Sequence, residues 1–248
     1  MEITGITIRI VEFDASPRFG DKPIPANRPK TWKYPIITVH TNAGIDGYSM
    51  GYGPHGDGEA MGDIIRQTYL PDVIGENPIH TERLWQKLRQ KNRHLYNLSD
   101  ALLGVLDVAF WDIKGKALNS SIAGLLGKYR DRIKTYATGR IYLPTDEELY
   151  NEAREAKEAG YHAFKLQLWQ GLAVDIPRFY AAREAVGDDF LLMQDASAGY
   201  TYAEALQVGR VLDKLNYYWF EEPISDRQLG LLRKLDSELG LPILVGES

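Results

Sequence analysis

The chain has 248 residues, a formal net charge of −5 and 25% charged residues, which is a composition typical of a folded protein with one large or two smaller domains. No basic stripe is present, which argues against nucleic-acid binding, and no apolar run reaches about 18 residues, which argues against a membrane span. Cysteine is absent, so disulfides, thiolate metal ligands and cysteine nucleophiles are excluded. We expect a cytoplasmic protein.

The first third of the chain is expected to fold as antiparallel strands followed by helices. Residues 3–13 alternate apolar and polar side chains, and two further alternating runs flank the turn-rich segment Thr41–Gly44, which predicts a β-hairpin. The segment 14–33, which lies between the first strand and the hairpin, contains four prolines and five Lys or Arg residues. Such a long loop is either a binding lid or disordered, and its composition does not decide between the two. Helical spacing of apolar residues then predicts helices at 59–70, 80–92 and 98–118.

From residue 133 onward, short apolar strands alternate with amphipathic helices, which predicts βα units and a parallel sheet. The interval from Lys165 to Asp195 is 30 residues, and those from Asp195 to Glu221 and from Glu221 to Glu247 are 26, close to the roughly 31 residues per unit of a (β/α)₈ barrel. Five strands do not close such a barrel and leave an exposed edge, so we expect a fragment of a longer protein. The predicted strands are 133–138, 162–168, 190–194, 217–220 and 243–246, and the predicted helices are 146–159, 175–186, 202–214 and 226–239.

Three of these strands end in a carboxylate: Asp195, Glu221 and Glu247. The carboxyl ends of parallel barrel strands meet on one face, so the three side chains are expected to converge. Two carboxylates at ~4 Å repel by about 4 kcal/mol at an effective dielectric constant of 20, so either their pKa values rise or a cation binds. Oxygen ligands without His or Cys favour Mg²⁺, with Mn²⁺ as the alternative. Each acid alone is equally typical of a strand end or a helix N-cap, but three in succession favour a metal site.

The strand-end motifs resemble those of the enolase superfamily, in its mandelate racemase and muconate-lactonizing branch. The resembling segments are Met193–Asp195, Trp219–Pro223 and Leu244–Ser248, together with Ile37–Tyr48, Leu106–Ala117 and Gly124–Gly127 in the first half. The resemblance implies an α+β capping domain followed by a modified TIM-like (β/α) barrel, of which about five strands are present. We place these domains at residues 1–125 and 126–248. The same resemblance also implies proton abstraction next to a substrate carboxylate that is bound to Mg²⁺, with one Mg²⁺ per active site.

Lys165 and Gln167 lie on the same face of the second barrel strand. Members of the resembling family commonly carry Lys-x-Lys here, one lysine binding the substrate carboxylate and the other acting as the base. Gln167 replaces the second lysine, and glutamine has no useful proton affinity, although its amide donates hydrogen bonds. The alternative for Lys165 is a strand-end lysine whose aliphatic part is buried.

Three further residues are candidates for substrate binding. Ser197 follows the Asp195 strand and either bonds near the metal or caps the next turn. Asn27 and Arg28, in the 14–33 loop, would recognise a polar, anionic substrate. Glu222 is interpreted as a supporting or helix-starting acid rather than as a metal ligand.

The residues and the resemblance together favour a Mg²⁺-dependent lyase that dehydrates an acid sugar through an enediolate. The broken lysine pair argues against racemisation by two bases, and the polar 14–33 loop suits a polyhydroxy acid. The alternatives are a racemase, epimerase or cycloisomerase of the same superfamily, or a non-catalytic relative that keeps the fold. The general base is expected beyond Ser248. We expect a homo-oligomer that acts on a small carboxylate substrate and binds neither nucleic acid nor membrane.

Overall fold

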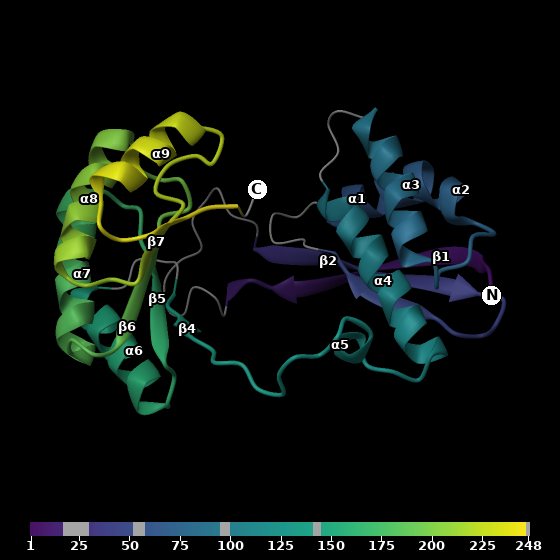
Figure 1. The fold of residues 1–248 in the computed structure, drawn as a ribbon, viewed down its shortest axis with the longest axis horizontal. Coiled ribbons are helices and arrows are strands. Elements are labelled where there is room, and N and C mark those ends of the chain that lie inside the picture. Colours follow the sequence, from purple (N-terminus) through teal and green to yellow (C-terminus); the bar gives the residue numbers. More distant parts are fainter. Residues whose placement is uncertain (17–29, 52–57, 95–99, 141–144, 247–248) are drawn as a thin grey trace. The chain divides into compact units, whose positions relative to one another are not determined.

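The computed structural model describes residues 1–16, 30–51, 58–94, 100–140 and 145–246. The chain divides into two compact units, Met1–Asp131 and Arg132–Ser248 (Figure 1). Each unit contains its own apolar core. The division falls a few residues after the boundary that we expected between residues 125 and 126. Within the described ranges, no helix is both long enough and apolar enough to cross a membrane.

The first unit is built on an antiparallel sheet of β1 (Ile3–Asp14), β2 (Thr31–Thr41) and β3 (Gly47–Met50), in that order. The predicted hairpin is confirmed, since β2 and β3 pair antiparallel across a turn in which Gly44 has a φ of 70°. A positive φ of this kind is readily adopted by glycine, which has no Cβ. The sheet therefore forms where the alternating pattern predicted it, except that β2 begins at Thr31, within the segment 14–33 that was expected to be a loop.

Helices complete this first unit. Helix α4 packs so closely on β3 that a Cβ added to Gly47 would lie 2.1 Å from the carbonyl oxygen of Ala109. The predicted helix at 59–70 is interrupted by a π-helical turn at Ile65–Tyr69, in which the N–H of Leu70 donates to the carbonyl of Ile65. The helical elements are α1 (Gly58–Ile64), the π-helix η2 (Ile65–Tyr69), α2 (Leu70–Val73), α3 (Thr81–Arg93), α4 (Ala101–Ala117) and α5 (Ile122–Leu125).

The second unit contains a five-stranded parallel sheet with the strands in sequence order, which confirms the predicted βα pattern. Helices α6 to α9 lie along one side of it (Figure 1). The strands are β4 (Ala137–Thr138), β5 (Ala163–Gln167), β6 (Leu191–Asp195), β7 (Trp219–Glu221) and β8 (Ile243–Leu244), and the helices are α6 (Asp146–Glu158), α7 (Leu172–Val186), α8 (Tyr202–Lys214) and α9 (Leu229–Glu238).

Three elements of this unit differ from the prediction by three or more residues at one end, namely β4, α7 and α9, which begins at Leu229 instead of at residue 226. Strand β8 covers only Ile243–Leu244 of the predicted 243–246. The first strand covers only Ala137–Thr138 of the predicted 133–138. Helix α7 begins at Leu172 instead of at residue 175. Gly171 has a φ of 106°, which lets the chain turn immediately before the helix, and its carbonyl accepts the N–H of Asp175 at 2.9 Å. The helix therefore starts early and contains Pro177 in its interior.

The strands of the second unit alternate between two faces. Phe164, Leu166, Leu192 and Phe220 point into the apolar core shared with the helices, and we call this the helix face of the sheet. The residues between them, Lys165, Gln167, Asp195 and Glu221, form the opposite face, which we call the site face. The register pairs Gln167 with Asp195, Asp195 with Glu221, and Glu221 with Leu244, so the strand ends are level.

Candidate active site

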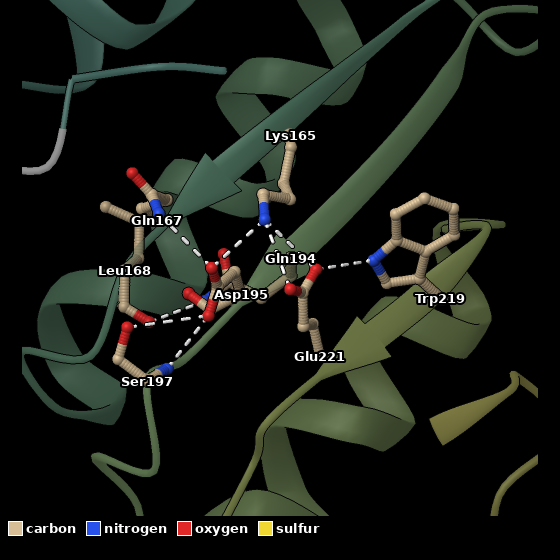
Figure 2. Close-up of polar contacts among 8 residues, drawn as sticks. All are labelled: Lys165, Gln167, Leu168, Gln194, Asp195, Ser197, Trp219 and Glu221. Carbon is tan, nitrogen blue, oxygen red and sulfur yellow. Dashed lines mark hydrogen bonds and ion pairs between the residues drawn. The ribbon is translucent and has the colours of Figure 1, made fainter. Parts of the chain in front are cut away.

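Three neighbouring strands bring one ammonium group and two carboxylates together. Lys165 Nζ lies 3.2 Å from Asp195 Oδ2 and 3.1 Å from Glu221 Oε2 (Figure 2). The side chains of Lys165, Asp195 and Glu221 are only 11%, 4% and 16% exposed. Because burial reduces solvent screening, this ion-pair cluster is electrostatically stronger than one on the surface.

Neutral donors hold the two carboxylates from the other sides. Gln167 Nε2 donates to Asp195 Oδ2 at 3.2 Å, and the backbone N–H of Ser197 donates to Asp195 Oδ1 at 3.0 Å. The indole Nε1 of Trp219 donates to Glu221 Oε2 at 3.1 Å (Figure 2). These hydrogen bonds fix the orientation of both carboxylates without neutralising their charge.

The surroundings of Lys165 favour its charged form. Burial by itself lowers the pKa of the Lys165 ammonium, but the charges and hydrogen bonds of Asp195 and Glu221 outweigh burial and raise that pKa above its ordinary value. In this arrangement Lys165 is therefore a cationic donor and not a proton acceptor.

A cavity of about 460 Å³ opens at this end of the sheet, within the range of small-molecule sites. It is lined by Lys165, Gln167, Asp195, Glu221, Glu222, Leu244, Val245 and Gly246.

Glu222 turns the chain immediately after the second carboxylate. Its backbone has a φ of 39°, which is unusual for a residue with a side chain, and the residue is buried. Its N–H donates to the carbonyl of Leu244, and its carbonyl accepts the N–H of Ala198, both at 2.8 Å. These bonds join the ends of three successive strands and hold the unusual backbone in place.

The donor set at the site face fits a hard divalent cation. Asp195 and Glu221 present carboxylate oxygens side by side without histidine, and Mg²⁺ is bound by such oxygens. Among the residues that the structure describes, no group of three or more His, Asp or Glu side chains is arranged to hold a metal ion. The third expected ligand, Glu247, lies outside the described residues.

The structure thus brings together five of the eight predicted site residues, which are Lys165, Gln167, Asp195, Ser197 and Glu221. Ser197 contacts the Asp195 carboxylate through its N–H and, at 3.5 Å, through its hydroxyl. Glu247, Asn27 and Arg28 lie outside the described residues, and their roles stay predictions.

Sequence reasoning missed a buried polar group on the helix face. Gln194 is fully buried, and its Nε2 donates to the carbonyls of Leu168 and Asp195. Tyr200 Oη lies 2.6 Å from Asp175 Oδ2 and 3.2 Å from the carbonyl of Leu168. This group fixes the backbone where β5 and β6 end, directly beneath the site residues. A polar residue at an alternate strand position, Gln194 between Met193 and Asp195, was the available signal.

Burial also changes the acidity of this group. Desolvation is the main cause that raises the pKa of Asp175, although Tyr200 and the backbone N–H groups of Gly171 and Gln170 oppose it by donating hydrogen bonds. The role of Trp219 in orienting Glu221 was not predicted from the sequence either, although Trp219 belongs to the strand-end motif Trp219–Pro223. Its side-chain contact with Glu221 spans only two positions along β7.

Comparison with known proteins defines the class. The family described as "Enolase C-terminal domain-like" matches residues 148–248, and the "Mandelate racemase / muconate lactonizing enzyme, N-terminal domain" matches residues 23–127. Both halves point to enolase-like proteins, with an α+β domain followed by a (β/α) barrel. The chain belongs to the mandelate racemase / muconate lactonizing enzyme branch of the enolase superfamily.

Among curated relatives, the chain is 30% identical to D-galactarolactone cycloisomerase of Agrobacterium fabrum, over 100% of this chain and 65% of the relative. It is 34% identical to arabinonate dehydratase of Saccharolobus solfataricus, over 80% of this chain and 55% of the relative. The chain therefore spans less than two thirds of the length of these relatives.

Solved structures give the same fold. The 3,6-anhydro-D-galactonate cycloisomerase of Zobellia galactanivorans matches with a TM-score of 0.83 and 31% identity, over 100% of this chain and 66% of that one. D-glucarate dehydratase of Agrobacterium tumefaciens, complexed with magnesium, matches with a TM-score of 0.84 and 29% identity, over 98% of this chain and 66% of that one.

Proposed function

We propose that this protein is a Mg²⁺-dependent lyase that removes the proton next to the carboxylate of an acid sugar and eliminates water. The observation that carries the proposal is the meeting of Lys165, Asp195 and Glu221 at the level ends of neighbouring strands. The similarity to proteins named arabinonate dehydratase and D-glucarate dehydratase supports this reaction class.

Each residue at the site has a task in this proposal. Asp195 and Glu221, together with Glu247, would hold the cation. Mg²⁺, when bound, supplies Lewis-acid stabilisation of the negative charge that develops on the substrate carboxylate. The Lys165 ammonium binds a carboxylate oxygen of the substrate, because it is cationic and faces the cavity.

Gln167 favours dehydration over racemisation. Racemisation by two bases needs a proton acceptor on each side of the substrate carbon, and an amide does not accept a proton at neutral pH. Gln167 instead suits hydrogen bonding to a substrate hydroxyl, a group that acid sugars carry on the carbon next to the carboxylate. Asn27 and Arg28 would add contacts to the same polar substrate.

A cycloisomerase or a racemase of the same superfamily is the second candidate, favoured by the 30% identity to D-galactarolactone cycloisomerase over the whole chain. The mass of the product separates the candidates. The protein with its whole natural chain should be incubated with a panel of acid sugars and their lactones in the presence of Mg²⁺. A 2-keto product lighter by one water supports the lyase, whereas a product of unchanged mass supports an isomerase.

A non-catalytic relative is tested by thermal melting of the same protein with Mg²⁺ and with EDTA. A ligand that binds only the folded state stabilises it by RT ln(1 + [L]/Kd), and the melting temperature rises accordingly. We expect a higher melting temperature with Mg²⁺. No shift at millimolar Mg²⁺, combined with no turnover of any acid sugar, would leave the metal-dependent enzyme without support.

A further inference from the structure

Among the residues that the structure describes, one ammonium group contacts both carboxylates of the site. Lys165 Nζ lies 3.2 Å from Asp195 Oδ2 and within 3.2 Å of both carboxylate oxygens of Glu221. An ammonium has three N–H donors, enough to face these three oxygens at once. All three side chains are largely buried. Removing the ammonium would therefore leave two poorly solvated carboxylates next to each other.

Within the described ranges, the other donors to these carboxylates are neutral. Gln167, the Ser197 backbone and Trp219 contribute an amide, a peptide N–H and an indole N–H. These groups orient the oxygens and do not repel a cation strongly. Lys165 differs from them because it carries a full positive charge at the oxygens that a divalent cation would use.

Resting on the proposed function, we propose that Lys165 competes with the divalent cation for Asp195 and Glu221. Two positive charges at the same buried oxygens repel each other, so binding of the cation displaces the ammonium from them. The released N–H donors are then available for a substrate carboxylate. Cation binding thereby prepares Lys165 for the substrate, and the cation binds before the substrate.

The test compares Mg²⁺ affinity among variants of the protein with its whole natural chain, by isothermal titration after removal of metal with EDTA and dialysis. Lys165→Met keeps the length of the side chain but removes the competing charge. We expect it to bind Mg²⁺ at least about tenfold more tightly than the wild type, because a like charge next to the ion is gone. Lys234→Met is the matched control, since it removes the same charge from an exposed surface pair with Glu238. We expect its Mg²⁺ affinity to equal that of the wild type.

Lys165→Arg tests the opposite case, in which the positive charge is kept. The guanidinium stays charged and binds carboxylates through two parallel hydrogen bonds, so we expect Mg²⁺ to bind no more tightly than to the wild type, and more weakly if the fork engages both acids. This variant keeps the inference testable if Lys165→Met does not fold without metal. Tighter Mg²⁺ binding by Lys165→Arg than by the wild type would overturn the competition.

Thermal melting gives a second readout that does not depend on activity. In EDTA, Lys165→Met should melt below the wild type, and Mg²⁺ should raise its melting temperature by more than it raises that of the wild type. Equal Mg²⁺ affinity and equal Mg²⁺-induced shifts in the wild type and Lys165→Met would overturn this inference and leave the proposed function standing. Absence of Mg²⁺ binding by the wild type and every variant would instead overturn both.

Discussion

The two faces of the five-stranded sheet use the same strands for opposite purposes. On the helix face, Phe164, Leu166 and Phe220 are almost completely removed from water and pack against the helices. On the site face, Lys165 and Glu221 occupy the positions next to them and carry opposite charges. Because side chains alternate along a strand, residues that stabilise the fold and residues that perform chemistry are direct neighbours in sequence. Substitutions at adjacent positions should therefore have different consequences.

The separation between an apolar helix face and a charged site face is incomplete, because a buried carboxylate occurs on each side of the sheet. Asp195 and Asp175 are both buried carboxylates. Asp195 has a cationic partner in Lys165, whereas Asp175 accepts hydrogen bonds from Tyr200 and two backbone N–H groups. Asp195 therefore lies next to a positive charge that can also bind an anionic substrate. The hydrogen bonds to Asp175 instead fix the loop before α7.

The largest effect on activity is expected from Glu221→Gln. The amide keeps the shape and the hydrogen bond from Trp219 but binds a divalent cation poorly. Since a catalytic metal is worth several kcal/mol, turnover should fall at least about a hundredfold. Melting temperature in EDTA should stay near that of the wild type. Undiminished turnover with Mg²⁺ would show that Glu221 is not a ligand.

A smaller loss of activity is expected when either hydrogen-bond donor of β5, Lys165 or Gln167, is removed. A hydrogen bond to a charged group contributes about 1.5–3 kcal/mol and a neutral one about 0.5–1.5 kcal/mol. Lys165→Ala should therefore reduce kcat/KM by about 10- to 100-fold and Gln167→Ala by about 2- to 10-fold. Steady-state kinetics on the substrate identified by screening would measure both. A greater loss in Gln167→Ala would exchange the roles assigned to the two residues.

The helix face should respond in the opposite way. Phe220 is fully buried next to Glu221, and Phe220→Ala should lower the free energy of unfolding by about 3–5 kcal/mol through lost burial and a cavity. Urea denaturation measures this change. Leu229→Ala, at a side chain that is 71% exposed, is the control and should change it by less than about 0.5 kcal/mol. Similar midpoints for Phe220→Ala and the wild type would contradict the division between the faces.

The sequence predicted the parallel sheet and the convergence of Asp195 and Glu221, because strand ends in successive βα units are level and periodicity marks each strand. It did not predict that Lys165 would contact both acids, because Lys165 comes from a different strand and reaches them through a long, flexible side chain. A residue pattern gives the face of a strand, but not the rotamer.

The polar group on the helix side shows a second limit. Asp175 and Tyr200 are 25 residues apart and meet only after α7 and β6 have packed. The early start of α7 has a similar origin, since it depends on the φ of Gly171 and on the bonds from Gln170 and Gly171 to Asp175. Single-residue propensities contain no information on such tertiary contacts, and the shortened β4 likewise lacks a local signal.

A smaller effect on stability than that of Phe220→Ala, and the sharpest test of the two buried acids, is expected from Tyr200→Phe. The change removes the hydroxyl that lies 2.6 Å from Asp175 Oδ2, and should lower the free energy of unfolding by about 1–3 kcal/mol at neutral pH. Tyr202→Phe is the matched control, because the buried Tyr202 hydroxyl has no hydrogen-bond partner among the described residues. It should be close to neutral.

The pH dependence of this difference tests its cause. Burial raises the pKa of Asp175 in the folded state, so its contribution to stability is fully present below the unfolded pKa of about 3.9 and is lost as pH rises through the folded pKa. The hydrogen bond from Tyr200 lowers the pKa of Asp175, so Tyr200→Phe should raise that pKa further. The variant should therefore lose more stability than the wild type as pH rises. The gap in unfolding free energy between the variant and the wild type should widen as pH increases above the unfolded pKa of about 3.9. A gap that stays constant with pH would mean that Tyr200 stabilises the loop through hydrogen bonding alone, without acting on the charge of Asp175.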